Sequence, residues 1–234
     1  MTTNLAALLL ADGRFPAGGH VHSAGVESAI ADGRVHDDAS LTAYVIGRLW
    51  TAGLTDAALA VATTTRVRAT HDVDERAAVV RALDAEADAR IVSPVLRSAS
   101  RRLGRQLLRA AGRCWPSEMW VTLDDLRTGT DGLHQACAWG LVGVAAELGV
   151  DEVARLMVHH ATSTPAMAAV RLLGLDPFAV AAMLAACADD GERVVDLAVG
   201  HAWTPLDELP AGAGPVVEIA SMEHARWDIR MFTT

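Results

Sequence analysis

Long stretches of the chain place alanine, leucine and valine at helical spacing, and short breaks of glycine, proline and aspartate separate these stretches. Within residues 38–52, one stripe at intervals of three and four residues holds Leu41, Tyr44, Val45 and Leu49. Only 4% of the residues are aromatic, although 51% are hydrophobic. Small aliphatic side chains favour closely packed helices over β-sandwiches, so we predict an all-α fold.

The breaks divide residues 1–234 into about ten predicted helices, which form a single helical-bundle domain. Residues 1–22 hold a short helix and a glycine-rich loop, and residues 205–234 hold a linker and a tail. We expect these two end segments to become ordered on partner binding. Between them, helices are predicted at 23–33, 38–52, 54–70, 73–90, 94–113, 132–148, 151–174 and 176–202, with a break at 189–191 and a strand-like or irregular segment at 121–131.

All 20 basic residues are arginine, and the formal net charge is −9. The absence of lysine excludes P-loop nucleotide hydrolases, Schiff-base enzymes and protein kinases, because each uses a lysine ammonium group. The acidic balance argues against nucleic acid as a partner. We find neither a signal peptide pattern nor an uninterrupted apolar run of about 18 residues, so we expect a cytoplasmic protein without membrane contact.

The most unusual local sequence is the loop that contains His20 and His22. Its glycines let backbone N–H groups approach a ligand or another chain. In an extended chain this spacing places both rings on one side, which suits a metal ion. With only two candidate ligands, a tight connection whose histidines bond the next helix is the favoured interpretation. A weak, transient nickel site at His20 and His22 is the alternative.

No catalytic motif is evident, because a GxSxG elbow, an HExxH pair and a Cys/His set are all missing. The adjacent His159 and His160 point about 100° apart on a helix, so we expect one at a polar surface and one in the core. The sequence therefore indicates no catalytic residues.

Four arginines recur every four residues on the predicted helix 94–113, namely Arg97, Arg101, Arg105 and Arg109. They form either a solvated face or an interface, since arginine is frequent where proteins bind each other. The sequence leaves both interpretations open.

Several ordered segments of the chain resemble the urease accessory protein F (UreF) family. The family's D-S-x-x-P-x-G-x-F-x-H-S-x-G-L-E pattern is matched by Asp12, Pro16, Gly18, His22, Ser23, Gly25 and Glu27. Residues 99–108 look like its A-S-x-x-M-G-R-x-L-L segment, 168–172 like its A-A-V-R-L helix, and 219–232 like its L-A-S-x-x-H…R-L-F tail. The chain departs from the family pattern at Gly13, His20, Asp228 and 174–178, which indicates a divergent, actinobacterial-like member of the family.

The resemblance implies a dimeric, non-enzymatic scaffold or chaperone that bridges the UreD/UreH protein and the UreG GTPase and delivers nickel to apo-urease. Nickel is then a transient cargo, and no cofactor is tightly bound. The residues that the resemblance assigns to partner binding are His22, Ser23, Glu27, Ser100, Arg101, Gly104, Arg105, Arg171, His224, Arg230 and Phe232. The alternative is a helical nickel-binding or regulatory interaction protein outside urease maturation.

Overall fold

A computed structural model describes residues 4–128 and 132–233, and within these ranges the chain is helical without a strand, as predicted. Ten of the α-helices have seven or more residues. The elements are, in chain order, α1 (Leu5–Ala11), η1 (Gly19–Val21), α2 (Val26–Ala31), α3 (Asp38–Arg48), η2 (Leu49–Gly53), α4 (Leu54–Ala69), α5 (Val73–Arg90), α6 (Pro94–Cys114), α7 (Met119–Thr122), α8 (Asp124–Thr128), α9 (Gln135–Ala145), α10 (Val150–Leu173), α11 (Pro177–Ala186), α12 (Ala188–Gly200), η3 (Leu206–Glu208) and α13 (Pro215–His224).

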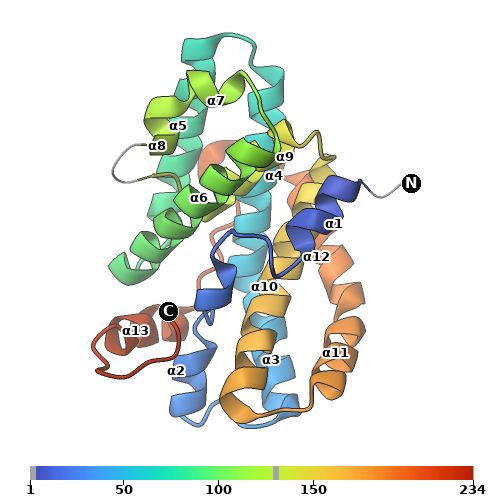
Figure 1. Cartoon of the computed structure of the whole chain (residues 1–234), viewed down its shortest axis with the longest axis vertical. Helices are drawn as coiled ribbons and strands as arrows, with labels where there is room; N and C mark the ends of the chain where they lie inside the picture. Colours follow the sequence, from blue (N-terminus) through green and yellow to red (C-terminus); the bar gives the residue numbers. More distant parts are fainter. Residues whose placement is uncertain (1–3, 129–131, 234) are drawn as a thin grey trace.

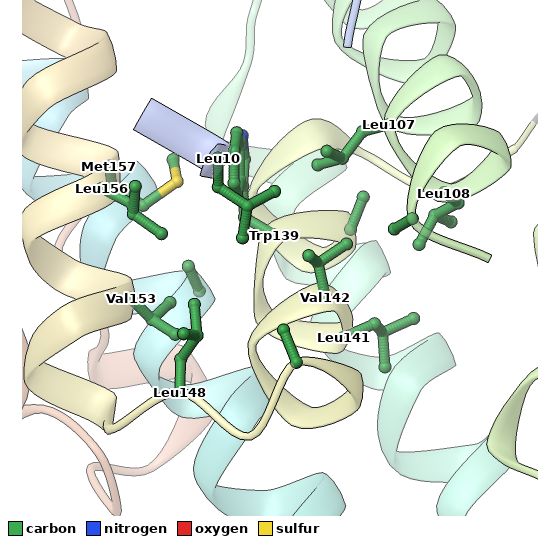
Figure 2. Close-up of a cluster of buried hydrophobic side chains, with 14 of the residues drawn as sticks. Leu10, Leu107, Leu108, Trp139, Leu141, Val142, Leu148, Val153, Leu156 and Met157 are labelled. Carbon is green, nitrogen blue, oxygen red and sulfur yellow. The ribbon is translucent and has the colours of Figure 1, made fainter. Parts of the chain in front are cut away.

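Helices α4 and α9 pack against each other at the centre of the bundle, α6 packs against α9, and α10 packs against α4 (Figure 1). A Cβ atom added at Gly140 would lie 2.5 Å from the Thr63 Cβ atom, so glycine allows α9 and α4 to approach this closely. Trp139 is 1% exposed and lies among leucine, valine and methionine side chains of α1, α6 and α10 (Figure 2). The small residues that dominate the composition therefore serve close helix packing.

Helices α3 and α4 are joined by the π-helical turn η2 into one helical segment, Asp38–Ala69, so the predicted break at Gly53 is wrong. Gly53 packs closely on α10, where an added Cβ atom would lie 3.2 Å from the Ala161 Cβ atom. By length and composition this segment is apolar enough to cross a membrane, yet 56% of its most apolar window is buried inside the chain. Since α4 packs against α5, α9, α10 and α12, it is the core helix of the bundle.

Other predicted boundaries also differ from the structure. The segment predicted as strand-like or irregular contains α7 and α8 in its described part, while 129–131 lie outside the described residues. The break between α11 and α12 falls at Cys187, not at 189–191. Asp189 and Asp190 lie instead in the first turn of α12, where carboxylates stabilise the positive end of the helix dipole.

Both end segments pack on their own chain. The Arg90 guanidinium donates to the carbonyl groups of Leu206, Leu209 and Pro210, at 2.9–3.1 Å, and thereby holds the linker against α5. The Thr55 hydroxyl donates to the Gly212 carbonyl at 3.2 Å. Beyond the linker, α13 packs against α2 and α6, and the last residues return toward the N-terminal loop (Figure 1).

Candidate partner-binding site

The Glu27 carboxylate joins the two ends of the chain. It lies on α2, is only 8% exposed, and accepts the backbone N–H groups of Met231 at 2.7 Å and Phe232 at 3.1 Å. The buried His224 ring contacts the same carboxylate through Nε2 at 2.8 Å. The Ser23 hydroxyl accepts the N–H group of Glu27 at 3.4 Å, and α2 begins at Val26, three residues later than predicted. We call Glu27, His224 and the 231–233 segment the terminal clasp.

The tail ends in a buried aromatic ring. Phe232 is 3% exposed, and the Arg171 guanidinium lies over its ring, 4.6 Å from the centroid. The same guanidinium donates to the His20 carbonyl at 3.3 Å, so α10 is tied to both the tail and the N-terminal loop. Thr233 adds a backbone hydrogen bond to the Val21 carbonyl at 2.9 Å. Segments about 200 residues apart in sequence thus form one ordered surface.

Gly25 allows α13 to reach this surface. Its φ is +83°, and an added Cβ atom would lie 2.7 Å from the Val217 Cγ1 atom and 2.9 Å from the Tyr44 hydroxyl. Only glycine combines this left-handed backbone with so close a neighbour. The Tyr44 hydroxyl donates to the Ala24 carbonyl at 2.7 Å and fixes the loop from α3.

The histidines predicted as a weak metal pair occupy different environments. The segment around His20 forms the 3₁₀ turn η1 and is not extended, so the assumption behind their shared side is wrong. His20 is exposed, whereas His22 is buried and lies 3.2 Å from the Thr233 hydroxyl through Nδ1. Burial, with Arg102 and His20 nearby, lowers the pKa of His22 to about 4. Among the described residues, no group of three His, Cys, Asp or Glu side chains is placed to hold a metal.

The exposed part of the tail carries Arg230 between two apolar side chains. Ile229 is 90% exposed and Met231 is 62% exposed. The Arg230 guanidinium donates to the Ala225 carbonyl at 3.1 Å, which holds it near the end of α13. An apolar pair around an arginine suits contact with another protein.

A second set of predicted residues lies at the junction of α5, α6 and α9. The Ser100 hydroxyl contacts His134 Nδ1 at 3.1 Å, and His134 Nε2 contacts Asp88 at 3.0 Å. Arg101 bonds Asp88 at 2.8 Å and Asp84 at 2.9 Å. Ser100, His134 and Asp88 contact one another in the order of a hydrolase Ser-His-Asp triad. Both ends of this row have further partners, because the N–H group of Gln135 donates to the Ser100 hydroxyl and the Arg101 guanidinium donates to the Asp88 carboxylate. We call this network the α6 junction.

Burial acts on both titratable ends of the α6 junction. It lowers the pKa of the His134 imidazole, because the charged ring is costly away from water. Burial alone would raise the pKa of Asp88, but hydrogen bonds from His134 and Arg101 hold it below its ordinary value. Gly104 completes the junction, since an added Cβ atom would lie 2.0 Å from the Leu133 carbonyl oxygen. Arg105 packs against Gly132 in the same way, with its Cγ atom 2.4 Å from the position of an added Cβ.

A cavity of about 170 Å³ lies between the terminal clasp and the α6 junction, and His22 and Ser100 both line it. Asp56 of α4 is half-buried and also lines it. Burial raises the pKa of Asp56 to about 6, although Arg48 opposes this. His160 packs on Trp139 with ring centroids 4.7 Å apart, and its Nε2 atom has no partner. Burial, helped by His159, lowers the pKa of His160 to about 4, so the cavity holds a neutral imidazole at pH 7.

Comparison with known proteins identifies the family. A sequence model of UreF matches residues 35–188. The chain is 37% identical over 238 residues to the urease accessory protein UreF of Mycolicibacterium vanbaalenii and 36% identical over 237 residues to that of Mycobacterium sp. strain JLS, with both chains of each pair fully covered. It is 40% identical over 176 residues to UreF of Mycobacterium tuberculosis, which covers 75% of this chain and 76% of the relative. The chain belongs to the UreF family.

Membership in the UreF family places the chain in urease maturation, as an accessory protein that associates with other urease accessory proteins. The matched residues 35–188 contain the α6 junction but not the terminal clasp. The full-length relatives extend over the clasp as well.

The predicted partner-binding residues of this UreF-family chain fall into two groups. One group gathers around the terminal clasp and consists of His22, Ser23, Glu27, Arg171 of α10, His224, Arg230 and Phe232. Those of the middle segment, Ser100, Arg101, Gly104 and Arg105, lie at the α6 junction. Their contacts with partner proteins stay predictions.

Sequence reasoning did not find four residues that complete these sites: Asp84, Asp88, His134 and Asp56. No local motif surrounds them, and each acquires its role from a contact with another helix or with the cavity. The expected split of the histidine pair holds, since His159 is exposed and His160 packs on Trp139.

Proposed function

We propose that this UreF-family chain is the scaffold that joins the UreD/UreH protein to the UreG GTPase during delivery of nickel to apo-urease. The observation that carries the proposal is the terminal clasp. By binding the backbone of the tail, Glu27 displays Ile229, Arg230 and Met231 in a fixed arrangement. A preorganised surface costs less conformational entropy on binding than a flexible tail.

The tail and α13 form the proposed docking surface for UreD/UreH. On α13, Val216 is 56% exposed and Ile219 is 57% exposed, so they add apolar surface beside the tail. Arginine surrounded by apolar side chains is frequent among residues that dominate binding energy. Arg230 is therefore the central residue of this surface.

The nucleotide chemistry belongs to the partner in this proposal. A phosphate-binding loop of the UreG kind needs a lysine, and this chain has none. The chain itself acts as a non-enzymatic chaperone that positions other proteins.

Nickel is transient cargo in this proposal, and no cofactor is tightly bound. Asp56 and His160 supply a carboxylate and an unprotonated imidazole nitrogen to the cavity, and both groups are ligands for divalent metals. Two such ligands suit brief contact better than storage, which usually takes three or four protein ligands. His20 and His22 stay the weaker candidates.

A homodimer is also part of the proposal, and α11 offers a face for it. This helix has no charged residue, and Val180 is its only fully buried side chain. Phe178 is 86% exposed. An exposed, uncharged helix is unusual on the surface of a monomer and suits contact with a second copy.

Sizing chromatography with light scattering tests the proposal. The chain alone should elute at twice its 24.6 kDa mass, hydrolyse no GTP, and join UreG into one complex only when UreD/UreH is present. Arg230→Ala should weaken UreD/UreH binding roughly tenfold, as expected for a residue of the binding centre. Arg81→Ala on exposed α5 is the matched control. Failure of the three wild-type proteins to form a complex would overturn the proposal.

A further inference from the structure

Helix α6 is the most basic element of an acidic chain. It has six arginines and no acidic residue over Pro94–Cys114, whereas the whole chain has a formal net charge of −9. Its buried face is formed by small and leucine side chains, among them Ala99, Leu107 and Ala111. All six positive charges therefore lie on the remaining faces.

Five of the six arginines form an inner row and an outer row, and the sixth, Arg105, packs against Gly132. In the inner row, Arg101 bonds Asp84 and Asp88, and Arg97 reaches Asp88 at 3.9 Å and the Ile91 carbonyl at 2.7 Å. The every-fourth-residue pattern of the sequence thus belongs largely to contacts within the fold.

The outer row consists of Arg102, Arg109 and Arg113, which we call the basic stripe. All three are exposed, and none of them makes an ion pair within the part of the chain that the structure describes. At 100° per residue they fall within about 40° of one another around the helix, and at 1.5 Å per residue they span roughly 16 Å. Three cations thus point the same way.

The basic stripe lies beside the N-terminal loop. Gln106, between its members, donates to the Pro16 carbonyl at 3.0 Å. Phe15 contacts Trp115 with ring centroids 6.0 Å apart, just beyond the end of α6. The loop and the basic stripe therefore form one continuous surface, which belongs to a different element from the α13 and tail surface.

We propose that the basic stripe binds an acidic surface of a partner protein, and that this partner is the one that the tail does not bind. The inference rests on the proposed function, in which the chain joins two different proteins. Three guanidinium groups in one row, without an ion pair to any described residue, fit a helix or loop that presents carboxylates at matching spacing, because arginine pairs with carboxylates in a two-pronged geometry. Opposite charge also speeds the encounter of the two surfaces.

Charge favours an acidic partner protein over a second copy of this chain and over nucleic acid. A second copy cannot place the same surface against itself across a two-fold axis, since three arginines would then face three arginines. A second copy that used its acidic surface elsewhere would form a ring or an open chain of molecules, not a two-fold dimer. Nucleic acid fits less well, because its phosphates would be repelled by a chain of net charge −9.

The test measures binding of the purified full-length chain to UreD/UreH and to the complex that also contains UreG, at low and at high salt. The variant Arg102→Glu/Arg109→Glu/Arg113→Glu reverses the basic stripe. The control Arg81→Glu/Arg193→Glu changes exposed arginines on α5 and α12. Circular dichroism checks that helicity is retained, and the three single variants replace the triple variant if it is not.

We expect the triple variant to bind the partner that the tail does not bind, UreG in the proposed function, at least tenfold more weakly at low salt, with a smaller difference at high salt. With UreD/UreH at a saturating concentration, the control and Arg230→Ala should leave that same binding step unchanged. The inference is overturned if the triple variant binds both partners as the wild type does, or if it loses the partner that Arg230→Ala loses. It is equally overturned if a DNA oligonucleotide binds the stripe as tightly as the protein does. If the wild-type chain binds neither partner, the proposed function itself fails.

Discussion

The α6 junction and the terminal clasp use the same chemistry for different purposes. In each, a carboxylate lies under the Nε2 atom of a buried histidine, with Asp88 and His134 in the first and Glu27 and His224 in the second. The α6 junction joins α5, α6 and α9, which pack in the middle of the bundle. The clasp instead holds the last residues of the chain, of which Phe232 is buried. The first network is therefore part of the global fold, and the second controls one surface segment.

This difference predicts how each region fails. A defect in the α6 junction separates three packed helices and unfolds the chain as a whole. A defect in the terminal clasp exposes little buried surface, so the tail opens locally while the bundle stays folded. Substitutions in the two regions therefore test whether one unfolds globally and the other opens locally.

The largest effect is expected for Gly104→Ala in the α6 junction. The new Cβ atom would lie 2.0 Å from the Leu133 carbonyl oxygen, so α6 has to move away from the 133–134 backbone. Overpacking of this kind costs about 3 kcal/mol or more when the neighbour is backbone. Urea unfolding followed by circular dichroism measures the loss in the free energy of unfolding.

Gly47→Ala is the matched control for that substitution. Gly47 also lies inside a helix, α3, but an added Cβ atom meets nothing within 4 Å. Alanine should therefore stabilise the chain by about 0.5–1 kcal/mol through helix propensity. If Gly104→Ala were as harmless as Gly47→Ala, the α6 junction would not be the rigid region that we infer.

An intermediate effect is expected at Asp56, in the cavity between the two regions. Its pKa is raised to about 6 by burial, so the folded chain holds this proton more tightly than the unfolded chain does. Stability from this group is fully present below pH 4 and is lost as the pH rises through about 6. Asp56→Asn removes the loss, and we expect it to raise the free energy of unfolding by about 2 kcal/mol at pH 7.5.

The difference in the free energy of unfolding between Asp56→Asn and wild type reports on Asp56 alone. The half-buried His160, with a pKa lowered to about 4, acts in the opposite sense, because its stability is lost as the pH falls from 6.5 toward 4. Both proteins share that loss, so it cancels in the difference. Unfolding curves at pH 4, 5, 6 and 7.5 should show the two proteins equal at pH 4 and diverging above it. A difference that is constant with pH would mean that burial does not raise the pKa of Asp56.

Much of the fold could be predicted from the sequence, because helix periodicity and glycine or proline breaks are local signals. The exceptions come from tertiary packing: Gly53 is typical of a helix end in the sequence, but in the structure it packs on Ala161 of α10 inside a continuous helical segment. The residues of the terminal clasp could be predicted only from the family resemblance, which identified Glu27 and His224 without indicating that they contact each other. The contact between Asp88 and His134 could not be predicted, because a single carboxylate and a single histidine form no sequence motif and meet only when α5 and α9 pack together.

The same limit applies to the arginines of α6. Spacing in the sequence favoured Arg97, Arg101, Arg105 and Arg109 as one face, whereas the structure ties Arg101 to α5 and leaves Arg109 outside. Which side of a helix is covered depends on its neighbours, and the neighbours of α6 are far away in sequence.

The smallest and most local effect is expected for Glu27→Gln in the terminal clasp. Glutamine keeps the shape but offers one acceptor oxygen where the carboxylate accepts two backbone N–H groups and meets His224. Loss of these charge-assisted bonds should speed hydrogen exchange at the Met231 and Phe232 amides roughly tenfold, which corresponds to about 1.4 kcal/mol. Glu223→Gln, on the exposed side of α13, should leave that exchange unchanged. If Glu27→Gln lowered global stability as much as Gly104→Ala does, the clasp would belong to the core, and the contrast between the two regions would disappear.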